Sequence, residues 1–254
     1  MKTVFLIRHA TAVSKNKGLP DFERSLVPKG IKEAKRTSRH LAQATPAPGL
    51  FVSSPANRAI ETAHLFAETL GYPTQKIQLE DVVYDGADVS ALMQLLRKVD
   101  DSHASVMVFG HDPLFSDFAH HLAPTYTQIM PKGAVLGLVF GCEHWAELVE
   151  GSGQVTYLDY PWNKTDRARL EKDARNDLAE QVAHAVEEAV AAMNLPGDSS
   201  ADKAARAVGR EVAARLFKGE RKQELVRRFM LRRLSEPSPE TATFHSDEED
   251  STEE

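Results

Sequence analysis

Residues 1–12 read MKTVFLIRHATA, and this stretch decides how the rest of the chain is interpreted. Residues 3–8 are mostly apolar, as in a strand that is buried on both faces of a sheet. The strand runs directly into Arg8 and His9. A cation and an imidazole at the end of a buried strand need a partner, because an uncompensated charge in apolar surroundings is costly. The sequence therefore predicts a negatively charged ligand at this point.

Strand and helix patterns alternate through the following hundred or so residues, which favours an α/β layer with a mainly parallel sheet. Further strands are predicted at 50–53, 77–79 and 105–110, and helices from about 28, at 55–70, at about 89–99 and at 113–122. The segments AVLGLVFG, WAELVE and QVTYLDY then follow one another without a helical pattern. They predict an antiparallel finish at the sheet edge.

The chain after residue 160 reads as helical. Apolar residues at four- or three-residue spacing predict an amphipathic helix over about 165–193, which LPGDSS breaks. A second helix should have Ala205, Val208, Val212 and Leu216 on one face, and a third should lie around Leu225 and Phe229. Pro, Ser, Thr and acids dominate from residue 235, where we expect disorder. The predicted domains are 1–160, a helical extension at 161–234 and an acidic tail at 235–254.

The net charge of −6 is unevenly distributed. Eight acids and no Lys or Arg follow residue 235, so the rest of the chain carries +2. Residues 203–233 hold eleven Lys or Arg against three Glu. This basic segment could bind an anionic partner or the acidic tail, although a solvated face with scattered ion pairs is the simpler interpretation. Aromatic residues that would stack on bases are not interleaved with the cations, so nucleic acid is not expected.

The composition is that of an ordinary globular protein. Cys142 is the one cysteine, which excludes an internal disulfide framework and is typical of a reducing compartment. Arg8 and His9 interrupt the apolar run at the N-terminus, and no stretch approaches the roughly 20 apolar residues of a spanning helix. We expect a soluble, cytoplasmic protein without a membrane partner.

Three predicted strands end in chemically active residues. Arg8 and His9 follow the first, FVSSPANRAIETA follows the second, and His111 follows the VMVFG strand. Ser54 and Asp112 each precede a proline and are predicted to cap the next helix, with Arg58 in a first helical turn. Because ligands of parallel sheets bind beyond the carboxyl ends of the strands, these side chains should converge.

The converging groups are two arginines, two histidines and two helix N-termini, which would repel one another unless an anion lies between them. A phosphoryl group matches the planar fork of an arginine. A neutral imidazole nitrogen can attack phosphorus and give a phosphohistidine that water cleaves. Neither a metal nor a cofactor is expected, because side chains supply the cations and no Walker-type loop or HExxH spacing is present.

These motifs resemble the histidine phosphatase superfamily, which has the phosphoglycerate-mutase-like fold. Arg8-His9, SSPANRAIETA and GHDP carry the resemblance, which covers about residues 1–160. The DFERSLVPKG and KGA segments, with no large insertion between the second and third motifs, are similar to its SixA-type branch of phosphohistidine phosphatases. The implied fold class is α/β, with three layers, a mainly parallel sheet flanked by helices, and an α-helical C-terminal extension.

The resemblance also implies roles for individual residues. His9 is the implied nucleophile, and Arg8, Arg58 and His111 are the implied phosphate clamp. Arg24 belongs to a D-x-x-R-x-L segment and should line the mouth of the site. Where the family usually has Gly and often an acid after the histidine, this chain has Ala10 and Thr11, so Thr11 offers only a hydroxyl donor to the substrate.

The general acid is left open at this stage. Many relatives use a carboxylate in the region that matches QLEDVVYDGAD, which offers Glu80, Asp81, Asp85 and Asp88. Asp81 and Asp85 are the candidates, although both are equally interpretable as loop acids. A phosphohistidine substrate needs less help, because a protonated imidazole is already a good leaving group, and this favours a phosphorylated protein as substrate.

Two alternatives remain beside the phosphohistidine phosphatase. One is a phosphatase of small phosphomonoesters, or a mutase, on the same scaffold, although mutases of this fold usually carry longer insertions. The other is a domain that binds phosphorylated partners without catalysis. The complete set of His9, Arg8, Arg58 and His111 speaks against the second, because a binding module has no need for a nucleophile.

Overall fold

The computed structural model describes residues 1–15, 18–45, 49–84, 88–162, 164–192, 199–218 and 221–235. The chain divides into two compact units, with the boundary between Glu171 and Lys172. The predicted domain limits at 160 and 234 stay a prediction. The predicted acidic tail and the LPGDSS break lie outside the described residues, apart from Ser235 and Ser199–Ser200, which belong to helices.

The first unit is built on a six-stranded sheet with the order β3-β2-β4-β1-β5-β6. Its strands are β1 (Lys2–Arg8), β2 (Leu50–Ser53), β3 (Gln78–Leu79), β4 (Ser105–Gly110), β5 (Val135–Phe140) and β6 (Gln154–Asp159). The first four are parallel to one another, whereas β5 and β6 are antiparallel to their neighbours. The predicted α/β class with an antiparallel finish is therefore confirmed.

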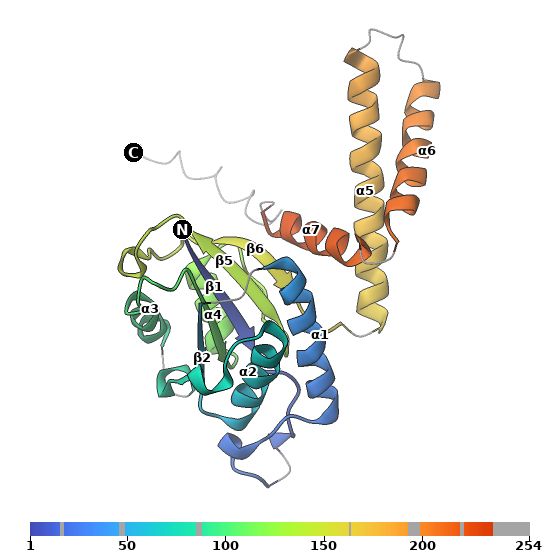
Figure 1. Cartoon of the computed structure of the whole chain (residues 1–254). Helices are drawn as coiled ribbons and strands as arrows, with labels where there is room; N and C mark the ends of the chain where they lie inside the picture. Colours follow the sequence, from blue (N-terminus) through green and yellow to red (C-terminus); the bar gives the residue numbers. More distant parts are fainter. Residues whose placement is uncertain are drawn as a thin grey trace, which may run out of the picture. The chain divides into compact units, whose positions relative to one another are not determined.

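Helices cover both faces of this sheet (Figure 1). They are α1 (Pro28–Ala44), α2 (Asn57–Leu70), α3 (Val89–Arg97) and α4 (Leu114–Leu122), and α1 packs beside α2 as α3 packs beside α4. Phe5 and Ile7 of β1 share a core cluster with residues of α1 and α2. Successive strand residues point to opposite faces, so the equally buried Val4 and Leu6 face the other helix layer.

The strand order brings the three chemically active strand ends together. β4 lies between β1 and β2, although it follows both in sequence. At the carboxyl edge the His9 N–H donates to the Gly110 carbonyl at 2.9 Å, and the Ser54 N–H donates to the Phe109 carbonyl at 2.9 Å. His9, Ser54 and His111 therefore leave the sheet side by side, as expected of ligand-binding residues in such sheets.

The predicted helix caps are wrong. α2 begins at Asn57 with Ala56 as its cap residue, and α4 begins at Leu114, and neither has a side-chain cap. The Ser54 hydroxyl bonds instead to the His111 ring at 2.7 Å. The Asp112 carboxylate instead accepts a short hydrogen bond from Ser116. Both polar side chains thus have stronger partners than a helix N-terminus. Arg58 still lies in the first turn of α2, as predicted.

The predicted strand at WAELVE is also wrong, because Trp145–Glu147 form a short 3-10 helix. The Trp145 backbone N–H donates to the Asp101 carboxylate at 2.9 Å, and its indole N–H donates to the His103 carbonyl at 2.8 Å. These two bonds fix a fully buried indole below the sheet edge. Satisfying a large buried side chain outweighs the weak strand pattern of this segment.

The helical unit contains the C-terminal part of α5 (Lys164–Ala192), together with α6 (Ser199–Leu216) and α7 (Arg221–Ser235). The helices are as predicted, but the predicted face of α6 is only partly buried. Of the predicted face, Ala205 is buried and Val212 is half-buried, whereas Val208 and Leu216 are exposed. Gly209 and Ala213 are buried instead. A Cβ on Gly209 would collide with the Ala179 carbonyl oxygen of α5. Small side chains let the two backbones approach closely, which large apolar residues would prevent.

None of the helices in the described ranges combines the length and the hydrophobicity that crossing a bilayer requires.

Candidate active site

His9 lies directly after β1 with only 6% of its surface exposed. Its Nδ1 is 2.8 Å from the Ala10 carbonyl oxygen. A carbonyl can only accept, so Nδ1 carries the hydrogen and Nε2 holds the lone pair of the neutral ring. The Ala10 N–H donates to the Thr62 hydroxyl at 3.2 Å, which ties this turn to α2. The His9 ring is thus fixed with its lone pair on Nε2.

Arg8 and Arg58 are held by their terminal nitrogens. Arg8 Nη1 donates to the Met130 carbonyl at 2.5 Å and lies 3.6 Å from the Asp112 carboxylate. Arg58 Nη1 and Nη2 donate to the Asp21 carbonyl and carboxylate at 2.6 and 2.8 Å. In both side chains the buried Nε has no hydrogen-bond partner within the described part of the chain. Each guanidinium therefore has a buried Nε–H donor that could bind a ligand.

His111, which follows β4, is the third such group. Its Nε2 bonds to the Ser54 hydroxyl, and that hydroxyl accepts from the Ala56 N–H at 3.3 Å. The Ser54 hydroxyl keeps its own hydrogen, which it can donate to Nε2. Nδ1 of His111 is buried and, among the described residues, has no partner. The His9 and His111 ring centroids are 5.1 Å apart, so the ring that carries this unpartnered Nδ1 lies next to the predicted nucleophile, His9.

Both histidines are neutral at physiological pH. Burial, supported by the charges of Arg58, Arg8 and Lys132, lowers the pKa of His9 to about 3. Burial, supported first by the charge of Arg58, lowers the pKa of His111 to about 2. A neutral imidazole has a lone pair on one ring nitrogen and can act as a nucleophile.

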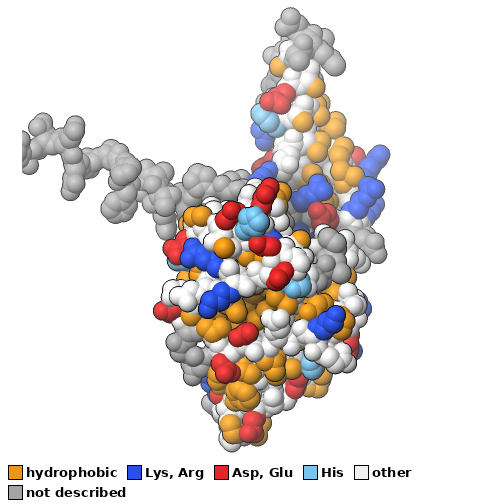
Figure 2. Space-filling view, turned by 60° about the vertical axis from the view of Figure 1, so that its left-hand side comes forward, with side chains coloured by type: hydrophobic (Ala, Val, Ile, Leu, Met, Phe, Trp, Pro, Cys, Tyr) orange, Lys and Arg blue, Asp and Glu red, His pale blue; other side chains and the backbone are white. Residues whose placement is uncertain are grey.

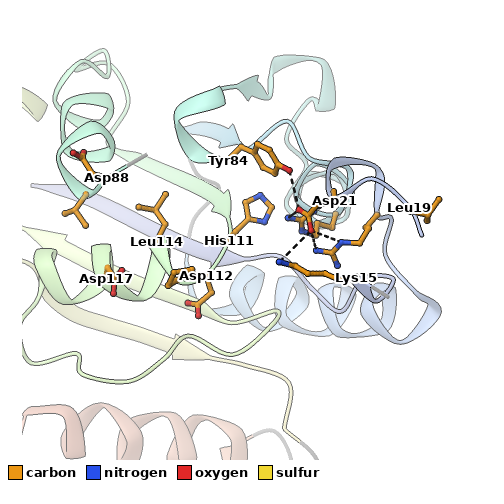
Figure 3. Close-up of a pocket in the computed structure, with 13 residues that line it drawn as sticks. Lys15, Leu19, Asp21, Tyr84, Asp88, His111, Asp112, Leu114 and Asp117 are labelled. Carbon is orange, nitrogen blue, oxygen red and sulfur yellow. Dashed lines mark hydrogen bonds and ion pairs between the residues drawn. The ribbon is translucent and has the colours of Figure 1, made fainter. Parts of the chain in front are cut away.

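A pocket of about 820 Å³ opens beside these residues (Figure 3). Three of the residues predicted for the site, Arg24, Arg58 and His111, line it. His9 and Arg8 are not part of its lining, and His9 borders it through the contact with His111. One end carries Lys15, Asp21 and Tyr84, and the other carries acids and apolar residues of α3 and α4 (Figure 3). The volume exceeds what a phosphoryl group alone requires.

Asp21 lies among the cations at one end of this pocket (Figure 3). Its carboxylate accepts from Arg24 at 2.7 and 3.0 Å and from Arg58 at 2.8 Å, and the Tyr84 hydroxyl lies 3.3 Å away. Desolvation alone would raise the pKa of Asp21. The hydrogen bonds and charges of Arg24 and Arg58 outweigh it and lower the pKa to about 2. Asp21 is therefore a fixed negative charge at neutral pH.

The two residues predicted to bind substrate lie in different surroundings. Arg24 lines the pocket and is anchored to the Val13 carbonyl at 2.7 Å as well as to Asp21. Thr11 is outside the lining, and its N–H and hydroxyl both donate to the Glu33 carboxylate, at 3.1 and 2.7 Å. The hydroxyl that was expected to face the substrate is thus committed to α1.

The carboxylates considered as general acids do not gather at the clamp. Asp81 is exposed and outside the pocket lining, and Glu80 lines a different hollow. Asp88 does line the pocket, but it caps α3 by accepting from the Ala91 N–H at 2.8 Å, which lowers its pKa. Asp85 lies outside the described residues.

Sequence reasoning missed Asp21, Tyr84 and Lys15 as members of the site. The D-x-x-R spacing of Asp21 and Arg24 was visible, and the two residues do form an ion pair. Tyr84 packs edge-on against both His111 and Phe22, with ring centroids 5.6 and 5.3 Å apart. No sequence signal places Tyr84 beside a histidine 27 positions later, because the contact depends on the packing of two separate loops.

Within the ranges that the structure describes, no group of three or more His, Cys, Asp or Glu is arranged to hold a metal ion.

Comparison with known families and structures agrees with the resemblance read from the motifs. The model of the histidine phosphatase superfamily (branch 1) matches residues 4–82, which contain Arg8, His9, Arg24 and Arg58. No protein with a curated description matches the sequence.

Among solved structures, SixA from Nakamurella multipartitia has a TM-score of 0.56 at 21% identity, covering 64% of this chain and 97% of its own. SixA from Agrobacterium tumefaciens has 0.53 at 22% identity, covering 63% and 99%. The protein histidine phosphatase SixA complexed with tungstate has 0.54 at 21% identity, covering 63% and 97%. The predicted resemblance and fold class are therefore confirmed, with the helices α5–α7 as a C-terminal region beyond the core.

Proposed function

We propose that this protein is a phosphatase that uses His9 as its nucleophile and acts on phosphohistidine in a protein. One observation carries the proposal. The buried nitrogens are Arg8 Nε at the end of β1, His111 Nδ1 just after β4 and Arg58 Nε in the helix that follows β2. None of the three has a partner among the described residues. Buried donors without partners are rare and costly, so an anion is the expected occupant. The family and fold matches support a phosphoryl group as that anion.

The first chemical step follows from the tautomer of His9. The Nε2 lone pair forms a bond to phosphorus while the bond between phosphorus and the leaving nitrogen breaks, and its electron pair goes to the leaving imidazole. Arg8, Arg58 and His111 would stabilise charge on the equatorial oxygens. With Ser54 donating to His111 Nε2, His111 presents its Nδ1–H to one of them. Water then attacks the phosphorus on His9 and releases phosphate.

Two carboxylates of the pocket, Asp21 and Asp88, favour phosphohistidine over an ester as substrate. An alcohol leaving group needs a proton from a general acid, whereas a protonated imidazole leaves as a neutral ring. Asp21 is ionised, with a pKa of about 2, and Asp88 is used as a helix cap with a lowered pKa. Neither is suited to hold a proton for an alcohol at neutral pH. The open pocket of about 820 Å³ is consistent with a side chain presented by a protein.

The test compares phosphate release by the wild type and His9→Ala. Substrates are a histidine-phosphorylated protein and a panel of small phosphomonoesters, without added metal. We expect release from the phosphohistidine protein, with a loss of at least about 10³-fold in His9→Ala, because the covalent route is removed. His40→Ala is the matched control, since His40 pairs with Asp159 at 2.7 Å and is outside the pocket lining.

The alternatives make different predictions in the same experiment. A preference for small esters would keep the nucleophile and overturn the substrate class. Binding of the phosphoprotein with no turnover of any substrate would make the protein a binding module and the assignment of His9 wrong.

A further inference from the structure

Asp21 makes more contacts to the cations of the pocket than any predicted site residue. Its carboxylate contacts Arg24 and Arg58, Lys15 lies 4.0 Å away, and the Tyr84 hydroxyl is within hydrogen-bond distance. The carboxylate is 38% exposed, whereas the Arg58 side chain is 5% exposed. An accessible acid therefore holds a buried cation of the proposed clamp.

The contacts between Asp21 and Arg58 leave one edge of the guanidinium open. Nη1 donates to the Asp21 carbonyl and Nη2 to its carboxylate, so both terminal nitrogens are engaged by the same residue. Nε, on the other edge, is the buried nitrogen without a partner among the described residues. Because the guanidinium is planar and rigid, fixing its two terminal nitrogens also fixes the direction of the Nε–H.

Asp21 is itself held firmly. Arg24 grips its carboxylate with Nε and Nη2 and is anchored through Nη1 to the Val13 carbonyl. The surrounding segment is tied to the rest of the unit by the Leu26 N–H, which donates to Glu61 at 2.7 Å, and by Asn57, which donates to the Glu23 carbonyl at 3.1 Å. Because the Asp21 carboxylate is fixed by these contacts, it can hold the Arg58 guanidinium in one orientation, which mobile water molecules could not do.

We infer that Asp21 is a positioning residue, which acts through Arg58 by directing the Arg58 Nε–H toward the transferred phosphoryl group. The inference rests on the proposed function, since it gives Arg58 its task. It assigns Asp21 no contact with the substrate. Tyr84 contacts the Asp21 carboxylate and the His111 ring, and it lines the same pocket.

Neutralising Asp21 should change phosphate binding and turnover in opposite directions. Without the carboxylate, Arg58 is free to turn its terminal nitrogens toward a bound phosphate, and a negative charge near that phosphate is removed. Binding of inorganic phosphate should therefore become about two- to fivefold tighter, the range of a half-exposed charge. Turnover should fall by about 10- to 100-fold, because the donor that serves the transition state is no longer fixed.

The experiment measures kcat on a histidine-phosphorylated protein and the Kd of inorganic phosphate for Asp21→Asn. Glu23→Gln is the matched control, because it neutralises an exposed carboxylate in the same 3-10 turn (Asp21–Glu23) without an ion pair among the described residues. Arg58→Ala and the double variant complete a cycle in both quantities. If Asp21 acts through Arg58, Asp21→Asn leaves kcat unchanged in the Arg58→Ala background. It then tightens the Kd of phosphate by less than in the wild type, because only the loss of a nearby negative charge remains.

Lower kcat, with phosphate affinity equal to or tighter than that of the wild type and no effect on kcat in the Arg58→Ala background, supports the inference. An unchanged kcat overturns it. So does a parallel loss of kcat, phosphate affinity and thermal stability, which would mark a merely structural role. A wild type that binds phosphate but turns over no substrate refutes the proposed function alone, and the cycle in Kd then decides the coupling of Asp21 to Arg58. A wild type that does neither refutes both.

Discussion

Two regions of this molecule are rich in arginine, and Arg58 in one and Arg215 in the other are held in opposite ways. At the edge of the sheet, Arg58 is 4% exposed, and its buried Nε has no partner among the described residues. In the helical unit, the Arg215 side chain is 76% exposed and pairs with Glu211 one turn earlier on the same helix at 2.8 Å. Arg228 pairs with Glu224 in the same way at 3.1 Å.

The difference teaches that the number of cations does not identify an anion site. On the face shown in Figure 2, the Lys and Arg side chains of the helical unit lie among hydrophobic and acidic ones. Such exposed pairs contribute little energy and can rearrange. Buried donors held away from solvent are a standing cost that an anion relieves. The proposed binding of an anionic partner or the tail by the basic segment therefore stays a prediction, whereas the sheet edge has the geometry of a site.

In this comparison, the largest expected effect is the difference in kcat/KM between Arg58→Ala, which removes a buried arginine, and Arg215→Ala, which removes an exposed one. Arg58→Ala should lower kcat/KM on a phosphohistidine protein by about 10²- to 10³-fold, as loss of one fixed donor to the transition state does in other enzymes. Arg215→Ala should leave kcat/KM within about twofold. Steady-state kinetics of the two variants measures this difference. Equal losses in both would mean that overall charge, rather than the buried donor, attracts the substrate.

The buried histidines should make the protein less stable in acid. His9 and His111 have pKa values of about 3 and about 2 when folded, against about 6.5 when unfolded. Below about pH 6.5 the unfolded chain binds protons that the folded chain does not, so stability falls as pH drops toward the folded pKa. At pH 5 each histidine should cost about 2 kcal/mol relative to pH 7.5.

Denaturant unfolding at pH 7.5 and pH 5 checks this effect in the wild type, His9→Gln and His64→Gln. Replacing His9 should reduce the loss at acid pH, whereas replacing His64, an exposed residue of α2, should not. Saturating phosphate should also reduce the loss, because an anion favours the charged imidazoles. An identical pH dependence in all three proteins would show that other groups control acid stability.

A smaller effect should follow from the Ser54 hydroxyl. Ser54→Ala removes the partner of His111 Nε2, which leaves the ring free to change tautomer or rotate. We expect kcat to fall by about tenfold, the value of one neutral hydrogen bond. Ser53→Ala is the neighbouring control, since the Ser53 hydroxyl donates only to the Ser54 carbonyl at 2.9 Å. If Ser53→Ala lowers kcat as much as Ser54→Ala, the effect belongs to the backbone of this turn and not to His111.

The smallest effect concerns the close packing of α6 on α5. Gly to Ala within a helix usually stabilises by about 1 kcal/mol. A Cβ on Gly209 would instead overlap the Ala179 carbonyl oxygen, and such overpacking typically costs about 1–3 kcal/mol. We therefore expect Gly209→Ala to lower the unfolding free energy of the helical unit by about 1 kcal/mol net. A gain in thermal stability, followed by circular dichroism, would show that this helix pair is not closely packed.

The sequence pattern within a few neighbouring residues was sufficient to predict several strands and the beginning of a helix. The strands 50–53 and 105–110 were predicted to the residue, and the start of α1 at Pro28 was predicted approximately. Their buried runs and the proline at a first helical position are signals contained in a few neighbouring residues. The meeting of three strand ends was also predictable, because it follows from a general property of parallel sheets.

What the pattern could not give depends on contacts between distant segments. Ser54 was predicted to cap a helix, but its partner is 57 residues away, at the end of a strand inserted between two earlier ones. Asp21 binds Arg58 across 37 residues, and the segment around it has no periodicity. On α6 the pattern favoured Val208, but close approach of α5 selected Gly209.

The most direct test is to locate the phosphoryl group on the protein during turnover. The enzyme is mixed with a histidine-phosphorylated protein, quenched within one turnover in alkaline denaturant and digested for mass spectrometry. The proposed mechanism predicts one acid-labile phosphoryl group on His9, at a level that rises in Ser54→Ala if hydrolysis becomes the slower step. Full turnover with His9 unmodified, or a phosphoryl group on another residue, would contradict it.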